Sequence, residues 1–385
     1  MAFSQQHYDI IIGGTGCSGL SLAWHLLSHD ALRNQNIAII DDGTQQPLNK
    51  TWCFWHTDHL PDPVPIHKSW NTLEIFAGES HHLAPLENLS YHCVRSEDYI
   101  REMTKALRAF PNLDWFAGPV KSSESNERRA VVEIPGRKLT GSHYFQSFGE
   151  ADLSRSRYKL LQHFKGIEIK TKTATFDTET ARFMDFRTPQ TEGATFFYVL
   201  PYSENQALAE YTLFSPELLP EEKYDEAIRT YLSDHLGLED EDYEIERSEF
   251  GVIPMADQIF RAGETGRIHY IGTRSGIPKA STGYAFSRIH RQAHAIASGY
   301  AQSGRVRITN PSAAKYRRYD AIMLDVLSRH PEFGVKVFEA LFNGNPIGRV
   351  LRFIDEKSTL SEDVRVMASV PRIKFLKAAV RNFKF

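Results

Sequence analysis

A glycine-rich loop between two short apolar segments constrains the fold of this chain more than any other feature. Residues 8–12 end in three isoleucines and predict a buried parallel strand. The loop at residues 13–19, Gly-Gly-Thr-Gly-Cys-Ser-Gly, follows, and residues 20–28 carry helix formers with one apolar face. A second buried strand is predicted at residues 37–40 and ends at Asp41. This order of elements is typical of a Rossmann-like fold that binds a dinucleotide.

Each glycine of this G-x-G-x-x-G pattern has a physical role. Gly14 allows a tight turn, Gly16 lets the backbone approach a pyrophosphate, and Gly19 lets the helix pack closely on the strand. Free N–H groups at the helix start attract phosphate, and Asp41 accepts hydrogen bonds from ribose hydroxyls. A glycine-rich turn without a ligand is the alternative. The pattern does not separate FAD from NAD, but its place near the first residue favours FAD by analogy.

A second segment near residue 270 follows the same logic. Residues 266–272 predict a strand that ends in glycine, and a loop of small residues follows at 273–281. A helix is predicted from Thr282 to about Ala301, with Ser281 or Thr282 as its N-cap. The positive end of that helix suits a flavin ring, whose N1–O2 edge is negative when reduced. An ordinary strand–turn–helix unit is the alternative. The candidate cofactor contacts here are Gly272, Thr273, Thr282, Gly283 and Tyr284.

Composition and charge exclude several other classes of protein. The 385 residues carry a net charge of -3, which disfavours a general nucleic-acid-binding role. Three cysteines without C-x-x-C spacing predict neither a disulfide framework nor a metal site. No apolar stretch approaches the length of a membrane-spanning helix, and the polar first eight residues do not look like a signal peptide. We therefore expect a cytoplasmic protein.

Several short motifs occur in the order seen in lycopene cyclases, a family of flavoproteins. The flavin-side motif is Gly-Thr-Arg-Ser-Gly followed by Ser-Thr-Gly-Tyr, and a short acidic motif, Leu-Ala-Glu-Tyr-Thr, precedes it. The segments that carry the resemblance are 49–55, 162–168, 183–187, 200–201, 208–212, 272–276, 281–284 and 351–353. Together they span nearly the whole chain, which resembles the bacterial lycopene β-cyclase type.

The resemblance implies an α/β fold of the glutathione-reductase type. It has a Rossmann-like FAD-binding domain, an interleaved strand-rich substrate domain and a helical C-terminal segment. On this basis the FAD-binding domain is expected at residues 1–60, 92–170 and 250–305, the substrate domain at 61–91 and 171–249, and the helical region at 306–385.

The resemblance also implies a reaction. Lycopene cyclases turn the linear ψ-end groups of lycopene into rings, giving γ-carotene and then β-carotene, so the enzyme is an isomerase. They use reduced FAD although substrate and product are isomers, and NAD(P)H supplies the electrons. An anionic reduced flavin would stabilise the carbocation through which the ring closes. The ring type (β, ε or γ), the number of ends cyclised and the oligomeric state stay open.

Glu210 matches the acid that the family uses to protonate its substrate. Alternation along a strand places Leu208, Glu210 and Thr212 on one face. An apolar site would keep this carboxyl protonated near neutral pH. Many relatives carry a second acid at the next position, where this chain has Tyr211, which would face the other way. A solvent-facing Glu210 is the alternative.

Three further residues occupy positions of interest in the family. Asp185 is expected either to assist the proton transfer or to pair with Arg187 or Arg182. Glu249 matches a position near the flavin, although a plain turn explains it equally. Arg95 stands where this fold often sets an arginine against the cofactor, and a surface arginine is the alternative.

The C-terminal residues 372–385 contain five basic residues and no acid. Phe375, Leu376, Ala379, Val380 and Phe383 share one face of the predicted helix. This pattern predicts a basic amphipathic helix on an anionic membrane, at the inner face of the cell membrane, where a carotene could enter. A helix packed on the body of the protein is the alternative.

Two other functions remain open at this point. One is an FAD-dependent carotenoid oxidoreductase or monooxygenase of the same fold, which would change the mass of its substrate. Against it stands Thr273, because hydroxylases of this fold usually have aspartate after the glycine. The other is a carotenoid or flavin binder without catalysis, which has no need of an acid at position 210.

Overall fold

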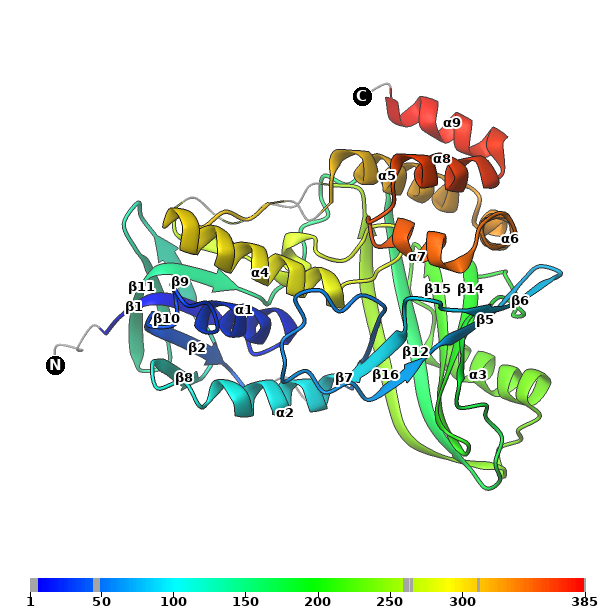
Figure 1. Ribbon diagram of the computed structural model, residues 1–385, viewed down its shortest axis with the longest axis horizontal. Coiled ribbons are helices and arrows are strands. Elements are labelled where there is room, and N and C mark those ends of the chain that lie inside the picture. Colours follow the sequence, from blue (N-terminus) through cyan, green and yellow to red (C-terminus); the bar gives the residue numbers. More distant parts are fainter. Residues whose placement is uncertain (1–5, 44–48, 259–262, 264–265, 310–311, 384–385) are drawn as a thin grey trace.

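Parallel strands from the start of the chain form the first lobe, on the left of Figure 1. The computed structural model describes residues 6–43, 49–258, 263, 266–309 and 312–383. The sheet of this lobe has the order β8-β2-β1-β11-β10-β9, and β17 also pairs with β11. Its strands are β1 (His7–Gly13), β2 (Ile37–Asp41), β8 (Leu113–Ala117), β9 (Ser122–Ser125), β10 (Ala130–Ile134), β11 (Arg137–Gln146) and β17 (Ile268–Tyr270).

Strand β1 is central in this sheet and is buried on both faces. Ile10 and Ile12 pack against the helices on one face, whereas Ile11 packs in a cluster with side chains of β10 and β17 on the other. A strand covered on both sides has no solvent-facing position, which explains its uninterrupted apolar run. The covering helices are α1 (Cys17–Leu27), α2 (Ser96–Leu107) and α4 (Phe286–Ser303).

A mostly antiparallel sheet, in which only β13 and β5 pair in parallel among the described strands, forms the second lobe, on the right of Figure 1. Its strand order is β16-β12-β15-β14-β13-β5-β6. Side chains alternate between two cores: Tyr198 of β14 faces the C-terminal helices, whereas its neighbour Phe197 faces α3 (Glu221–Leu236). The strands are β5 (Thr72–Ala77), β6 (Ser80–Pro85), β12 (Lys159–Thr171), β13 (Thr180–Asp185), β14 (Ala194–Ser203), β15 (Gln206–Ser215) and β16 (Tyr243–Ala256).

A small sheet of the order β3-β7-β4 connects the two lobes (Figure 1). It consists of β3 (Thr51–Phe54), β4 (Lys68–Trp70) and β7 (Tyr91–Arg95). Phe54 of β3 packs into the core of the first lobe, whereas Cys93 of β7 packs into the core of the second. The small sheet therefore fixes the position of one lobe against the other.

Helices at the end of the chain cover the second sheet on the face opposite to α3, at the top of Figure 1. They are α5 (Ala314–Arg329), the 3-10 turn η2 (Pro331–Phe333), α6 (Gly334–Gly344), α7 (Ile347–Ile354), α8 (Leu360–Ser369) and α9 (Arg372–Phe383). Helix α9 packs on α5, where Phe375 joins an apolar cluster with Val326. In the part of the chain that the structure describes, no helix is long and apolar enough to cross a membrane.

The predicted α/β class is confirmed, with a Rossmann-like lobe, an interleaved strand-rich lobe and a helical C-terminal part. The sheets divide the chain at other places than the expected boundaries at residues 170 and 250. Strand β12, expected with the cofactor segments, pairs along its length with β15 and β16 in the second sheet. Strand β16 itself runs across the second expected boundary.

Candidate functional site

The glycine-rich loop between β1 and α1 has the shape of a phosphate cradle. Gly14 has a φ of +98°, which L side chains rarely adopt. A Cβ on Gly19 would lie 2.0 Å from the carbonyl oxygen of Gly14, so only glycine lets the helix start this close to the loop. A Cβ on Gly16 would meet nothing within 4 Å, which means that space is open beside its backbone.

Asp41 closes the cradle from the end of β2. Its carboxylate accepts a hydrogen bond from the backbone N–H of Thr15 at 2.9 Å and another from the Thr15 hydroxyl. Open backbone at a helix start and a nearby acid are what the pyrophosphate and ribose of a dinucleotide require. The residues present thus fit the ADP half of FAD.

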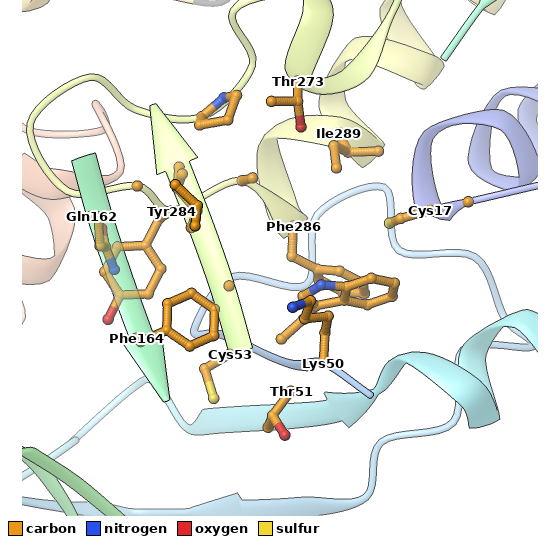
Figure 2. Close-up of a pocket in the computed structure, with 18 of the residues that line it drawn as sticks. Cys17, Lys50, Thr51, Cys53, Gln162, Phe164, Thr273, Tyr284, Phe286 and Ile289 are labelled. Carbon is orange, nitrogen blue, oxygen red and sulfur yellow. The ribbon is translucent and has the colours of Figure 1, made fainter. Parts of the chain in front are cut away.

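One cavity of about 580 Å³ extends from this cradle into the second lobe. It starts at Gly16 and Cys17 and reaches Glu210 on β15. Figure 2 shows Cys17 and Ile289 on one side, Gln162 and Phe164 on the opposite side, and Lys50 pointing between them. Aromatic side chains supply much of its wall: Trp52, Tyr91, Phe148, Phe164, Tyr198, Phe250, Tyr284 and Phe286.

The second predicted cofactor segment lies on the same cavity. Thr273, Thr282, Gly283 and Tyr284 line it, whereas Gly272 lies against α1, where a Cβ would come within 2.5 Å of the Ser18 Oγ. A chain segment 250 residues further along thus closes onto the glycine-rich loop. The fold thus brings the two predicted cofactor segments together at one site.

The predicted start of the helix in this segment is wrong. Helix α4 begins at Phe286, with Ala285 as its N-cap, and the 3-10 turn η1 (Gly272–Ser275) precedes it. Gly283 has a left-handed φ of +71°, which a helix cannot accommodate, and Ser281 donates its hydroxyl to Asp320 instead of capping the helix. Thr282 consequently lies in a turn that faces the cavity.

Tyr284 lies at the acid end of the cavity. Its hydroxyl is 3.3 Å from the hydroxyl of Tyr198. Tyr198 is the cross-strand neighbour of Glu210 on β14. The structure therefore places Tyr284 at the end of the cavity where Glu210 lies, away from the phosphate cradle.

Glu210 projects into the cavity from the middle of the second sheet. Leu208 and Phe214 pack on the same face of β15, and Thr212 donates its hydroxyl to the Glu210 Oε1 at 2.9 Å. Tyr211 packs on the opposite face against the core beneath α3, as strand alternation predicts. Burial, and then the charge of Glu249, raise the pKa of Glu210 well above its ordinary value. The side chain is only half-buried, but what exposes it is the cavity itself.

Glu249 meets Glu210 across the strand that separates them. Both residues are register partners of Gly166 on β12, one from each side. A Cβ on Gly166 would lie 3.1 Å from the Glu249 Cγ and 3.4 Å from the Glu210 Cβ, so the missing side chain gives the two carboxyls room to meet. The negative charge of Glu249 therefore acts directly on Glu210 and favours the protonated form of that carboxyl.

Several groups around Glu249 favour its charged form. Its Oε2 accepts hydrogen bonds from the Thr51 hydroxyl and an Arg247 N–H, both at 2.8 Å. Burial raises the pKa of Glu249, but these donors oppose the rise, so Glu210 is the carboxyl that keeps a proton more readily. Oε1 of Glu249 is buried and has no hydrogen-bond partner among the described residues.

Arg95 does not line the cavity. It forms an ion pair with the buried Glu168 and stacks over Tyr202, with 5.2 Å to the ring centroid. Glu168 also contacts Arg247, at 3.4 Å. Arg95 therefore reaches the site only through a chain of charged groups that ends at Glu249.

Asp185 lies on the wrong face of the sheet for a part in the chemistry. It is fully buried under α3, where Tyr231 donates a hydrogen bond at 2.6 Å and Arg187 donates bonds at 2.9 and 2.6 Å. These donors outweigh the effect of burial and lower its pKa. Of the two expectations for Asp185, pairing with arginine is the one that the structure shows.

Sequence reasoning missed Lys50, Gly166 and Gln162. Gly166 was part of a recognised segment, but only the sheet register shows that both glutamates flank it. Gln162 lines the cavity directly under Gly283. Within the described ranges, no cluster of three His, Cys, Asp or Glu residues could hold a metal ion.

The sequence pattern of the family described as "Lycopene cyclase protein" matches residues 9–380. The chain belongs to the lycopene cyclase family. No curated protein sequence matches it significantly.

Solved structures share the fold of this family member at low identity. A flavoprotein/dehydrogenase from Cytophaga hutchinsonii gives a TM-score of 0.64 at 9% identity, covering 98% of this chain and 100% of that one. A geranylgeranyl bacteriochlorophyll reductase-like protein from Thermoplasma acidophilum gives 0.59 at 11%, covering 99% and 98%. The halogenase PltM, solved with phloroglucinol and FAD, gives 0.59 at 12%, covering 91% and 82%. These similarities show an FAD-type Rossmann fold and no more.

Proposed function

We propose that the protein is a lycopene β-cyclase, an isomerase that closes β-ionone rings at the ψ-end groups of lycopene. It would give γ-carotene and then β-carotene. The observation that carries the proposal is the Glu210–Glu249 pair: burial and the charge of Glu249 raise the pKa of Glu210, which lines a cavity that also reaches the phosphate cradle. A proton donor that is neutral at physiological pH is what protonation of an alkene requires.

The carboxyl pair performs the proton transfers of this reaction. Glu210 donates its proton to the terminal double bond of the end group, which leaves a positive charge on the tertiary carbon. The neighbouring double bond attacks that carbon, and a new carbon–carbon bond closes the ring. The now anionic pair then removes one proton from a ring carbon, for which the free Oε1 of Glu249 is available. One proton enters and one leaves, so the mass does not change.

FAD fits the other end of the cavity. Gly14, Gly16 and Gly19 with Asp41 would hold its ADP half, and Thr273 and Thr282 would contact its ring. When bound and reduced, with NAD(P)H as the source of electrons, FAD supplies a negative charge that stabilises cationic species nearby. The aromatic wall would exclude water and present π-faces to the positive charge.

We further propose that the protein works at the inner face of the cell membrane. On α9, Ile373, Leu376 and Val380 are 72%, 64% and 55% exposed. They recur at helical spacing, and Lys377 beside them is exposed as well. The apolar face predicted from the sequence is divided, because Phe375 packs inward on the body of the protein. The side chain of Phe383 and residues 384–385 lie outside the described part.

The test is to express the chain in cells that accumulate lycopene and to chromatograph the pigments. A cyclised product of unchanged mass supports the proposal, and its absorption spectrum identifies the ring. Unchanged lycopene beside soluble, flavin-loaded protein would overturn it. A product of altered mass would favour the FAD-dependent oxidoreductase or monooxygenase instead.

A further inference from the structure

Lys50 brings a positive charge into the cavity between its two ends. The residue directly precedes β3, and its half-buried side chain lines the cavity together with Cys17 and Glu210. Figure 2 shows its side chain pointing into the open space. The ammonium thus faces the volume that joins the phosphate cradle to the carboxyl pair.

The ammonium of Lys50 is not neutralised by a direct ion pair. Among the described residues, no carboxylate lies within 4.0 Å of its Nζ, in contrast to Arg95 and Arg247 nearby. The ammonium lies over the ring of Phe164, 5.7 Å from the ring centroid. Burial lowers the pKa of Lys50, and the more distant Glu249 and Glu210 oppose that fall. A buried charge without a partner is costly, so an anion in the cavity would stabilise this arrangement.

The backbone of Lys50 is fixed. Its N–H donates to the Ser96 Oγ at 3.0 Å, and its carbonyl accepts from the Ser96 N–H at 2.9 Å. Ser96 is the first residue of α2 in the first lobe. These two hydrogen bonds hold the backbone from which the Lys50 side chain extends into the cavity.

A flavin in this cavity would become an anion on reduction. The ring takes up two electrons and one proton and then carries one negative charge, whereas oxidised FAD has a neutral ring. A positive side chain near the ring favours the reduced form, and charge near the ring is one of the means by which proteins tune flavins. Arg95, expected from the sequence to lie against the cofactor, forms an ion pair with Glu168 instead.

We propose that Lys50 binds the anionic reduced flavin ring and thereby raises the midpoint potential of bound FAD. The inference rests on the proposed FAD site but not on the cyclisation. The effect of Lys50 on the potential is the same for any reductant, because it depends only on the charge of the reduced ring.

The test compares midpoint potentials of the FAD-loaded wild type, Lys50→Met and Lys50→Arg, measured against a reference dye. We expect Lys50→Met to bind reduced flavin at least about tenfold more weakly relative to oxidised flavin. That ratio corresponds to a midpoint potential lower by about 30 mV for a two-electron couple. Lys50→Arg keeps the charge and should keep the potential. Lys138→Met is the matched control, because Lys138 is an exposed lysine on β11 that pairs with Glu133.

Equal potentials in the wild type and Lys50→Met would overturn the inference, as would a wild type that binds no FAD. If Lys50→Met is insoluble, Lys50→Gln is measured in its place, with the same two outcomes. A wild type that leaves lycopene unchanged, while Lys50→Met still lowers the potential, would overturn the cyclase proposal and support this inference.

Discussion

The second sheet carries a carboxyl group of contrasting environment on each of its two faces, Glu210 on one and Asp185 on the other. Glu210 points into the cavity, where it has one neutral hydroxyl donor and a second carboxyl beside it. Asp185 points under α3, where two arginines and a tyrosine hydroxyl surround it. The pKa of Glu210 is raised, whereas that of Asp185 is lowered.

The difference shows how one sheet separates chemistry from stability. A carboxyl without cationic donors holds its proton and can give it to a substrate. A carboxyl surrounded by donors is permanently charged and can only hold its neighbours in place. Burial alone does not decide the outcome, because both groups are removed from bulk water. What decides it is which face of the sheet the residue occupies, because that face sets which donors surround the carboxyl.

The largest effect is expected for Glu210→Gln. Because glutamine has no acidic proton, we expect cyclisation to fall by roughly 10²- to 10⁴-fold. The measurements are the turnover of lycopene and the flavin content of the purified protein. The flavin content should stay unchanged, because the substitution does not alter the phosphate cradle. A variant that keeps turnover within a few-fold of the wild type would remove Glu210 from the mechanism.

Glu249→Gln is expected to have a smaller effect, a roughly tenfold loss, and to move the pH profile. Activity needs protonated Glu210 and so declines as the pH rises through the pKa of that group. The charge of Glu249 contributes to this raised pKa, and its removal lowers the pKa. The alkaline limb of the profile should therefore move to lower pH. An alkaline limb that stays in place or moves to higher pH would show that the charge of Glu249 does not raise the pKa of Glu210.

The sequence predicted much of this comparison, and its failures have a physical reason. The glycine-rich loop and Asp41 follow from local spacing, whereas the choice of Glu210 came from the resemblance to the family. Strand alternation predicted that Tyr211 faces away from Glu210. The pairing of Glu210 with Glu249 could not be predicted, because it depends on the register of three strands around Gly166.

The same limit explains the uncertainty over Asp185 and Arg95. Each has a charged partner that other strands or helices bring close, such as Tyr231 of α3 for Asp185 and Glu168 of β12 for Arg95. Spacing along one segment cannot show such partners. Lys50 escaped notice for the converse reason, since only the folded cavity shows that a lysine lacks a carboxylate partner.

Asp185→Asn tests the other face of the sheet. We expect a loss of about 2 kcal/mol in the free energy of unfolding, because two arginines lose their charged acceptor. The lowered pKa makes this contribution present at neutral pH and lost as the pH falls through the folded-state pKa, below the ordinary value of 3.8. Denaturant unfolding of both proteins at pH 7 and near pH 3 measures the difference. Cyclisation by the folded variant should match the wild type, and a large loss would return Asp185 to the active site.

The smallest effect is expected for Tyr211→Phe. Tyr211 follows the acid directly in the chain, but its ring centroid lies 5.1 Å from that of Phe197 under α3. Removing the hydroxyl costs at most about 1 kcal/mol of stability, the typical contribution of one hydrogen bond. Turnover and the ratio of ring products should stay within about twofold of the wild type, since neither face of the cavity changes. Phe196→Leu, on the cavity-side core, is a useful contrast because it alters the layer that supports Tyr198. A changed ring product in Tyr211→Phe would mean that the two faces of β15 are coupled, and the separation of chemistry from stability would then fail at its closest point.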